Sequence, residues 1–144
     1  MSTPRVDDEL AISALLHRYA RAVDAKDWEL YRSVFTEDAD IDYPGVVSGS
    51  RDEVADWMAT NFDAGVPMSM HYITNIEILE YDGDSATVRA MFYNPMQLVG
   101  MADLSHCGGY YHHELVRTGE GWKSRRLRED NVWFTNRPAA VQTP

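Results

Sequence analysis

Four long extended segments occupy the second half of the chain, and they constrain its fold more than any other feature. After Pro67 the pattern changes from helical spacing to strand-like runs, and in the second run apolar and polar side chains alternate. Such alternation is typical of a strand with one buried face. Tight turns are expected at Asp82-Gly83 and at 119–121. The predicted strands are Ser69–Tyr81, Ser85 to about Val99, His106–Thr118 and Trp122–Phe134.

The last of these predicted strands carries an irregularity. Its alternation fails around Arg125, Arg126 and Leu127. A β-bulge, which inserts one extra residue into a strand, would account for this failure. The pattern therefore leaves open which side chains of this strand face inward.

The first half of the chain repeats apolar residues at helical spacing. From Asp7 to Ala25 they form one stripe, which predicts a first helix. Asp27 is a candidate cap for a second, shorter helix, and a short strand is expected at Ala39–Tyr43. The segment Ser50–Glu53 has the form of a capping box and predicts a third helix that ends near 63–65.

Helices followed by a long antiparallel meander predict the fold class. The sheet must be covered on one side by the helices, which gives an α+β domain. We expect a cone-shaped α+β barrel, with three N-terminal helices packed on a curved, mostly antiparallel sheet around an apolar pocket. At 144 residues the chain has the usual size of one domain, so residues 1–144 are predicted to form a single domain with a frayed tail from about Arg137.

Charge and composition exclude several classes of partner. The 13 Lys and Arg residues against 23 Asp and Glu residues give a net charge of −10, which repels polyanions and makes nucleic acid an unexpected partner. The basic run Lys123–Arg128 is interpreted as a solvated strand face. No stretch has the length and apolarity of a membrane helix, and the N-terminus lacks a signal-peptide pattern, so a cytoplasmic protein is expected. The single Cys107 is interpreted as a buried, inert thiol.

Asp24 is the first candidate for chemistry. It lies where the first predicted helix ends, and a carboxylate there opposes the negative end of the helix dipole. An unfavourable position of this kind suggests a functional role. The alternative is that Asp24 is an ordinary turn residue.

His71 is the second candidate. It opens a strand of mostly apolar residues, and alternation places its side chain on the same face as Ile73 and Asn75. A lone histidine in an apolar strand is more often a satisfied core residue than a catalyst. An aspartate bound to one ring nitrogen would fix the tautomer and leave the other nitrogen free as a base. Asp24 is the candidate partner.

Aromatic and methionine residues are more numerous than a small core usually requires. Most are expected in the core, while a minority are expected to line a pocket for a flat, hydrophobic ligand. The residues assigned to this pocket are Trp57, Met58, Phe92, Met96 and Tyr111.

Metal and covalent chemistry find no support in the motifs. Adjacent His112 and His113 point to opposite faces of a strand, and neither an HExxH motif nor paired cysteines occur. Glycine-rich phosphate loops and a GxSxG nucleophile motif are also missing from the sequence. We therefore expect no metal and no cofactor.

Several segments together resemble a known family. They are 18–28, which contains Tyr19 and Asp24, then Asp42-Tyr43, 69–72 with His71, 108–110 and 117–122. These segments are similar to the SnoaL-like branch of the nuclear transport factor 2 superfamily, over roughly Asp7–Phe134. Members that resemble this chain include scytalone dehydratase, bile-acid 7α-dehydratase and hexachlorocyclohexane dehydrochlorinase.

The resemblance implies a site and a reaction class. In these enzymes an aspartate and a histidine at the positions of Asp24 and His71 form a catalytic dyad. A tyrosine of the bile-acid enzyme matches Tyr19, and an active-site tyrosine of scytalone dehydratase lies in a segment similar to 41–43, which matches Tyr43. Met96 and Val23 stand where scytalone dehydratase has a histidine and a tyrosine, which argues against scytalone as substrate. The family also contains isomerases, polyketide cyclases and non-catalytic subunits, and its members often form homodimers or homotrimers.

The resemblance and the residues together lead to one hypothesis about function. The chain is expected to be a cofactor-independent lyase of the dehydratase type, acting on a hydrophobic cyclic, steroid-like or polyketide-like small molecule. His71 would remove a proton, Asp24 would stabilise the imidazolium, and Tyr19 or Tyr43 would bind the substrate oxygen. The alternatives are an isomerase or polyketide cyclase that uses the same base, and a non-catalytic binding or assembly subunit.

Overall fold

The helices form where the apolar stripes predict them. In the computed structural model, which describes residues 2–139, α1 spans Val6–Ala25, α2 spans Trp28–Val34 and α3 spans Arg51–Trp57. The third helical segment continues through a π-helical turn, η1 (Met58–Phe62), into α4 (Asp63–Gly65). Asp27 caps α2 by accepting from the Leu30 N–H at 3.0 Å, and both hydrogen bonds of the Ser50–Glu53 capping box are present. The capping signals therefore predicted the starts of α2 and α3, whereas α1 was predicted from its apolar stripe alone.

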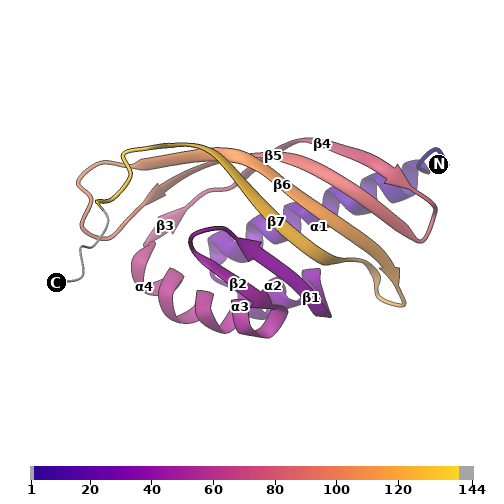
Figure 1. The fold of residues 1–144 in the computed structure, drawn as a ribbon, viewed down its shortest axis with the longest axis horizontal. Helices are drawn as coiled ribbons and strands as arrows, with labels where there is room; N and C mark the ends of the chain where they lie inside the picture. Colours follow the sequence, from indigo (N-terminus) through magenta and orange to yellow (C-terminus); the bar gives the residue numbers. More distant parts are fainter. Residues whose placement is uncertain (1, 140–144) are drawn as a thin grey trace.

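Seven strands form one sheet (Figure 1). Its strand order is β2-β1-β7-β6-β5-β3, and β4 also pairs with β5. β1 pairs with β7 in parallel, whereas the other pairings are antiparallel. The strand bounds are Phe35–Tyr43 (β1), Val47–Ser50 (β2), Met68–Ser69 (β3), Tyr72–Tyr81 (β4), Ser85–Gln97 (β5), Ser105–Thr118 (β6) and Gly121–Thr135 (β7).

Two strand predictions need correction. β1 begins at Phe35, four residues before the predicted start, and the short hairpin partner β2 was not predicted. The predicted strand Ser69–Tyr81 is in fact two strands, because pairing with β5 is interrupted at residues 70–71. A second irregularity follows at Asn75, which has a positive φ of 49° and is exposed, so it does not share the inward face with Ile73.

The irregularity predicted in the last strand is a β-bulge. Glu114 pairs with Arg126 and Leu115 pairs with Ser124, so Arg125 is the extra residue. A second bulge lies at Val132, between the pairs Gly109–Asn131 and Gly108–Trp133. A Cβ atom on Gly109 would lie 1.9 Å from the Asp130 carbonyl oxygen, so this close approach of β6 to the bulged strand requires glycine.

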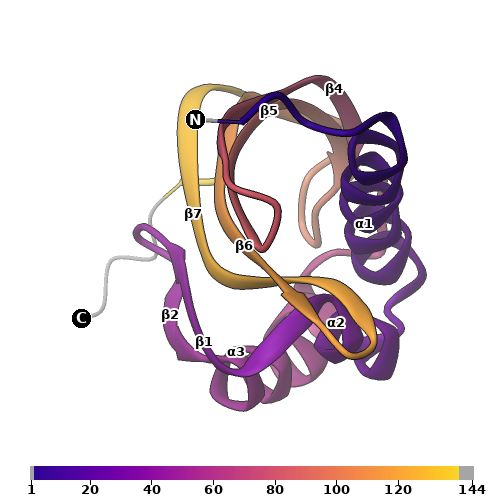
Figure 2. The same ribbon diagram turned by 90° about the vertical axis from the view of Figure 1, so that its right-hand side faces the viewer.

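The curved sheet and the helices enclose the core. Viewed from its end, the sheet curls over, with α1 along one side and α2 and α3 below (Figure 2). The inward side chains of the sheet and of the helices form one hydrophobic cluster. The α+β cone predicted from the sequence is confirmed. Arg137, where fraying was predicted to begin, is exposed, and residues 140–144 lie outside the described part.

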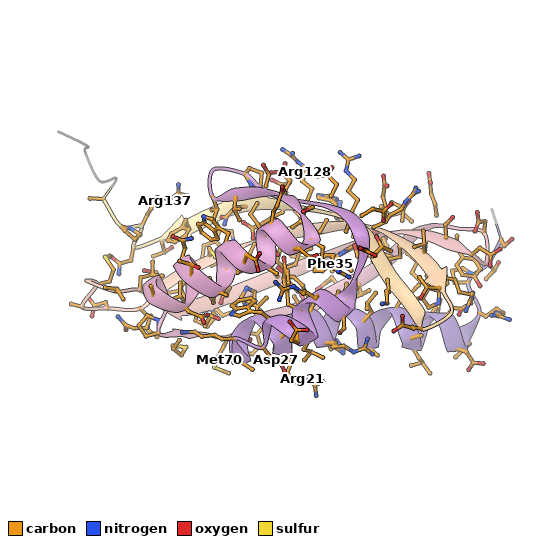
Figure 3. The ribbon with its side chains drawn as sticks, turned by 90° about the horizontal axis from the view of Figure 1, so that it is seen from below. Arg21, Asp27, Phe35, Met70, Arg128 and Arg137 are labelled. Atoms are coloured by element: carbon orange, nitrogen blue, oxygen red, sulfur yellow. The ribbon has the colours of Figure 1, made fainter. Side chains whose placement is uncertain are left out.

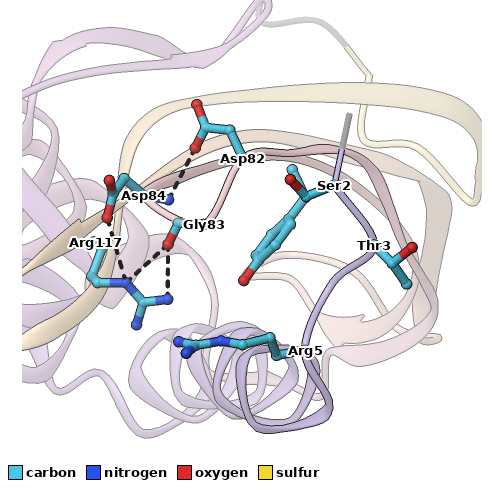
Figure 4. Close-up of a pocket in the computed structure, with 8 residues that line it drawn as sticks. Ser2, Thr3, Arg5, Asp82, Gly83, Asp84 and Arg117 are labelled. Carbon is cyan, nitrogen blue, oxygen red and sulfur yellow. Dashed lines mark hydrogen bonds and ion pairs between the residues drawn. The ribbon is translucent and has the colours of Figure 1, made fainter.

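A buried carboxylate joins the start of α1 to the sheet. Asp8 is 3% exposed and accepts hydrogen bonds from Tyr81 at 2.5 Å, Trp122 at 3.0 Å, Arg117 at 2.8 Å and Arg5 at 3.2 Å. Arg117 also donates to the Gly83 carbonyl beside a surface pocket (Figure 4). These four donors, which outweigh the cost of burial, hold the pKa of Asp8 well below its ordinary value. Asp8 is therefore an ionised anchor that attaches the N-terminal end of α1 to β4, β6 and β7.

Candidate active site

The structure brings Asp24 and His71 into direct contact. The Nδ1 atom of His71 lies 2.6 Å from Oδ1 of Asp24, and the backbone N–H of His71 donates to Oδ2 at 2.7 Å. The hydroxyl of Ser69 also donates to Oδ1 at 2.7 Å. The carboxylate of Asp24 is thus fully used in holding the segment that carries His71, and it is not a simple turn residue.

The interruption between β3 and β4 makes this contact possible. On one side of the break, Met70 donates its N–H to the Pro95 carbonyl of β5 at 3.1 Å. The next N–H, that of His71, leaves the strand pairing and turns to Asp24 near the end of α1. A continuous strand would commit backbone groups to regular pairing with β5. The break therefore positions the imidazole ring.

The protonation state of the pair follows from its hydrogen bonds. Burial opposes ionisation of Asp24, but the bonds from His71 and Ser69 outweigh it and lower the pKa of this carboxyl. Because an ionised carboxylate only accepts hydrogen bonds, the proton of the neutral ring lies on Nδ1. The lone pair of His71 is then on Nε2. The side chain of His71 is only 6% exposed, so this nitrogen is shielded from bulk solvent.

A cavity of about 520 Å³ lies beside the pair. Its volume is in the range of pockets that bind small molecules. Of the residues predicted for the site, those that line the cavity are Tyr19, Tyr43, His71, Trp57, Met58, Met96 and Tyr111. Met58 belongs to the π-helical turn η1, and such turns are frequent at functional sites.

Two predicted site residues lie behind the cavity wall. Asp24 is in contact with His71 but does not line the cavity. Phe92 is 4% exposed and stacks on the ring of Tyr111, with 4.4 Å between ring centroids. The structure thus places Phe92 in the core, where it supports Tyr111, instead of on the pocket surface.

Three tyrosine hydroxyls form a chain next to the dyad. The hydroxyl of Tyr43 lies 2.7 Å from that of Tyr19 and 2.9 Å from that of Tyr31. Burial raises the pKa of all three well above the ordinary value, so the hydroxyls remain protonated. Tyr31 does not line the cavity, and the sequence prediction missed it because its helical spacing is that of a core residue. Protonated hydroxyls next to a histidine are suitable donors to a ligand oxygen.

The sequence prediction also missed a group of polar residues in the cavity lining. It consists of Asn94 on β5, Cys107 on β6, and Glu129 and Asn131 on β7, all of which line the cavity. The bulge at Arg125 hid the facing of β7 from pattern analysis. Once this bulge is allowed for, Leu127 is buried and Glu129 follows it at the two-residue period of the inward face. Asn131, two residues further on, is exposed but also lines the cavity.

The neighbours of Glu129 confirm its facing. Arg128 is exposed and pairs with Asp42 on the outside, where Figure 3 shows its side chain at the edge of the molecule. Burial raises the pKa of Glu129. Burial, followed by the charge of Glu129, raises the pKa of the Cys107 thiol to about 11, so the thiol stays protonated.

The described part of the chain, residues 2–139, lacks two kinds of feature. No group of three or more His, Cys, Asp or Glu side chains is placed to hold a metal ion in this part of the chain. His113 is buried and bonded to Ser124 at 2.9 Å, and burial lowers its pKa to about 3. None of the described helices combines the length and apolarity needed to cross a membrane.

Comparison with known proteins places the chain among relatives of the same fold. A profile described as SnoaL-like domain matches residues 4–128. A solved structure from Novosphingobium aromaticivorans, named as an aromatic ring hydroxylase, is 31% identical and has a TM-score of 0.82; the match covers 92% of this chain and 95% of the other.

Two more solved structures are less similar in sequence. One, from Novosphingobium aromaticivorans and named as a scytalone dehydratase, is 19% identical with a TM-score of 0.83, and 97% of each chain is covered. The other is the hexachlorocyclohexane dehydrochlorinase of Novosphingobium barchaimii. It is 22% identical with a TM-score of 0.82, over 96% of this chain and 94% of the other. At these identities the likeness concerns the fold.

Proposed function

The chain belongs to the SnoaL-like domain family, and on this premise we propose that it is a cofactor-independent lyase of the dehydratase type. Its substrate would be a hydrophobic cyclic small molecule, steroid-like or polyketide-like, that carries a hydroxyl and a carbonyl. The observation that carries this proposal is the Asp24–His71 pair, whose ring nitrogen Nε2 is held beside a cavity of suitable size.

The chemistry begins with proton removal by His71. Its Nε2 takes a proton from a carbon next to the substrate carbonyl, and the ionised Asp24 stabilises the imidazolium that forms. The charge that develops on the carbonyl oxygen is stabilised by a donor of the tyrosine chain. Tyr43 is suited to this role, because its two neighbours Tyr19 and Tyr31 can both donate to it and leave its own proton for the ligand.

The comparisons support a lyase within this family. Solved structures of the same fold are named as a scytalone dehydratase and as a hexachlorocyclohexane dehydrochlorinase. Both names describe eliminations, in which a proton and a leaving group depart from neighbouring carbons. Loss of water is proposed for this chain over loss of halide, because a hydroxylated substrate needs less special chemistry from the pocket. Met96 and Val23 argue only against scytalone itself.

Loss of turnover in dyad variants tests the proposal. Wild-type protein is incubated with a panel of hydrophobic cyclic hydroxyketones, and loss of water is followed by mass spectrometry. His71→Ala and Asp24→Asn are expected to lower kcat/KM by about 10²- to 10⁴-fold, the usual contribution of a general base. His17→Ala and Asp38→Asn, which change exposed residues of the same types, are the matched controls. Full turnover in both dyad variants would contradict the mechanism.

An isomerase or a polyketide cyclase is the nearest alternative. The same base would remove the proton, but an isomerisation conserves the mass of the substrate. The product mass in the same panel therefore distinguishes this alternative from the proposed elimination.

A non-catalytic subunit is the second candidate. The family resemblance includes non-catalytic subunits, and the relative that is 31% identical is named as an aromatic ring hydroxylase, a different activity from a dehydratase. This candidate predicts a larger partner that copurifies with the chain and turnover of the assembly that is indifferent to Asp24→Asn. The direct contact between Asp24 and His71 supports a catalytic role over this alternative.

A homodimer or homotrimer is proposed as the assembly, with the outer face of the sheet as its interface. Three aromatic side chains are exposed there, namely Tyr72, Tyr93 and Trp133. Tyr93 lies 5.7 Å from Tyr72 and 6.0 Å from Trp133 between ring centroids. Exposed apolar patches commonly mark contact surfaces. A cytoplasmic location stays a prediction.

A further inference from the structure

Glu129 is the carboxylic acid among the described residues that line the cavity, and the dyad chemistry does not use it. It pairs across the sheet with Tyr111, so both side chains lie on the same inward face. Within residues 2–139 no Lys or Arg side chain lies within ion-pair distance of Glu129; Arg137, which also lines the cavity, stacks on Phe134 at 4.8 Å. An acid without a cationic partner in an apolar cavity is unusual and suggests a chemical role.

Whenever Glu129 is ionised, its charge reaches the tyrosines of the cavity lining. After burial, which is the larger cause, this charge contributes to raising the pKa of the hydroxyls of Tyr19, Tyr43 and Tyr111. In turn, the positive form of His71 lowers the pKa of the Glu129 carboxyl and so partly opposes the effect of burial, which raises it. The Glu129 carboxyl and the proposed base His71 therefore line the same cavity. In the sheet, β6 and β5 separate the strand of Glu129, β7, from β3 and β4, which flank His71.

Asn94 provides a second, independent observation in the same group of polar residues. Its side chain is 95% buried, since it is 5% exposed, and its oxygen Oδ1 has no hydrogen-bond partner within the described residues. A buried acceptor without a donor is costly unless a ligand supplies the donor. Cys107 pairs with Asn94 across the sheet, and the pKa of its thiol responds to both Asn94 and Glu129. An acid and an unused acceptor thus line the same cavity.

We propose that Glu129 protonates the departing hydroxyl of the substrate while Asn94 accepts a hydrogen bond from the same hydroxyl. This inference rests on the proposed elimination and adds a selectivity to it. A hydroxyl both donates and accepts hydrogen bonds, whereas a halide only accepts. Glu129 and Asn94 therefore select a hydroxylated substrate over a halogenated one.

The proton and electron balance of the step is complete. His71 takes the C–H proton, and the electrons of that bond pass to the carbonyl oxygen as an enolate. When the carbonyl reforms, the C=C bond forms and the C–O bond breaks. The oxygen that leaves takes the carboxyl proton of Glu129 and departs as water. The imidazolium then returns its proton to the Glu129 carboxylate through solvent, which restores both groups.

Substitution of Glu129 tests the inference. Glu129→Gln keeps the size and polarity of the side chain but has no acidic proton. The probes are a two-ring β-hydroxyketone that the wild type dehydrates and the β-chloroketone of the same skeleton. We expect kcat for the hydroxyketone to fall by about 10²- to 10⁴-fold, while the chloroketone, whose chloride leaves without a proton, is little affected. Asp130→Asn, which changes the adjacent exposed carboxylate, is the matched control.

Further variants keep the failure modes separate. Glu129→Asp retains an acid and is expected to recover part of the lost rate, and Asn94→Ala is expected to reduce the preference for hydroxyl over chloride. Equal losses on both probes, or no loss on either, would overturn the role of Glu129. If His71→Ala is also without effect on the chloroketone, the proposed function itself fails.

An infrared measurement tests the acid without turnover. The stretching band of a protonated carboxylic acid is recorded near neutral pH for wild type, Glu129→Gln and Asp130→Asn. We expect a band in the wild type and in Asp130→Asn that is missing in Glu129→Gln. A wild-type spectrum without this band would contradict the proposal.

Discussion

At the scale of single residues, the site depends on how one carboxylate is shared. Asp24 binds both the ring and the backbone N–H of His71, and it also accepts from Ser69. These three donors compensate for placing a negative charge at the end of α1, where the helix dipole is unfavourable. The cost that singled out Asp24 in the sequence is therefore offset by contacts that orient the base.

The tyrosine chain leads to a prediction about a residue that does not touch the cavity. Tyr31→Phe removes one hydrogen bond to Tyr43 while keeping the buried ring. Because a neutral hydrogen bond contributes about 0.5–1.5 kcal/mol, kcat is expected to fall about two- to twelve-fold, with KM unchanged. Steady-state kinetics measure both constants, and Tyr72→Phe on the exposed face is the control. An unchanged kcat would limit Tyr31 to a packing role.

The two residues of the dyad could be singled out from sequence patterns, but their pairing rested on the family resemblance. Position at a helix end marked Asp24, and strand alternation suggested an inward His71. Family resemblance joined them. Tyr31 and Glu129 were missed, because helical spacing resembles core packing and because a bulge destroys the alternation on which facing depends. Asn94 lies on the inward face of the regularly alternating β5, but alternation does not show that its oxygen has no partner.

At the scale of secondary-structure elements, irregularities in the strands position the residues of the candidate site. The break between β3 and β4 turns His71 toward Asp24, and the bulge at Arg125 brings Glu129 inward. Regular strands and capped helices follow periodicity and could be predicted. Interruptions depend on strand partners that are distant in sequence, so local patterns missed the break at residues 70–71 and the bulge at Val132. The bulge at Arg125 was indicated because it disturbs the alternation of its own strand.

The anchor of α1 predicts how stability depends on pH. The pKa of Asp8 is lower in the folded chain than in the unfolded chain, so its stabilising effect is complete above the unfolded value and is lost as the pH falls through and below about 4. Thermal unfolding midpoints are expected to drop over this range in the wild type. In Asp8→Asn the midpoint at neutral pH is already lower, and the decrease in acid is smaller.

A neighbouring substitution serves as the control for this measurement. Asp7→Asn changes an exposed carboxylate in the same helical turn. It is expected to keep the wild-type midpoint and the wild-type response to acid. An Asp8→Asn variant with the same acid response as the wild type would contradict the assignment.

At the scale of the whole molecule, the cone has two different faces. Its inside holds the cavity, while its outside exposes the aromatic rings of Tyr72, Tyr93 and Trp133. The overall architecture could be predicted because helices followed by a meander permit few arrangements. The interface of the assembly could not be derived from the sequence pattern. Alternation shows only that a side chain points outward, and it does not distinguish an outward residue in an interface from one in solvent.

The outer face leads to a prediction about assembly. We expect wild-type protein to be a dimer or trimer by size-exclusion chromatography with light scattering. Tyr93→Glu places a charge in the middle of the aromatic patch and is expected to give a monomer with an unchanged circular dichroism spectrum. Leu10→Glu, at an exposed apolar position of α1, is expected to leave the assembly intact. A monomeric wild type would refute this interface.

The two-point attachment of His71 to Asp24 has a stereochemical consequence. Since the same carboxylate holds the ring and the backbone, the imidazole has no freedom to rotate toward a second position in the cavity. A ligand seated against the tyrosine chain therefore presents only one of its two prochiral hydrogens to Nε2. Deuterium from heavy water would accordingly enter the substrate on one face, and the protein would distinguish mirror-image carbon acids.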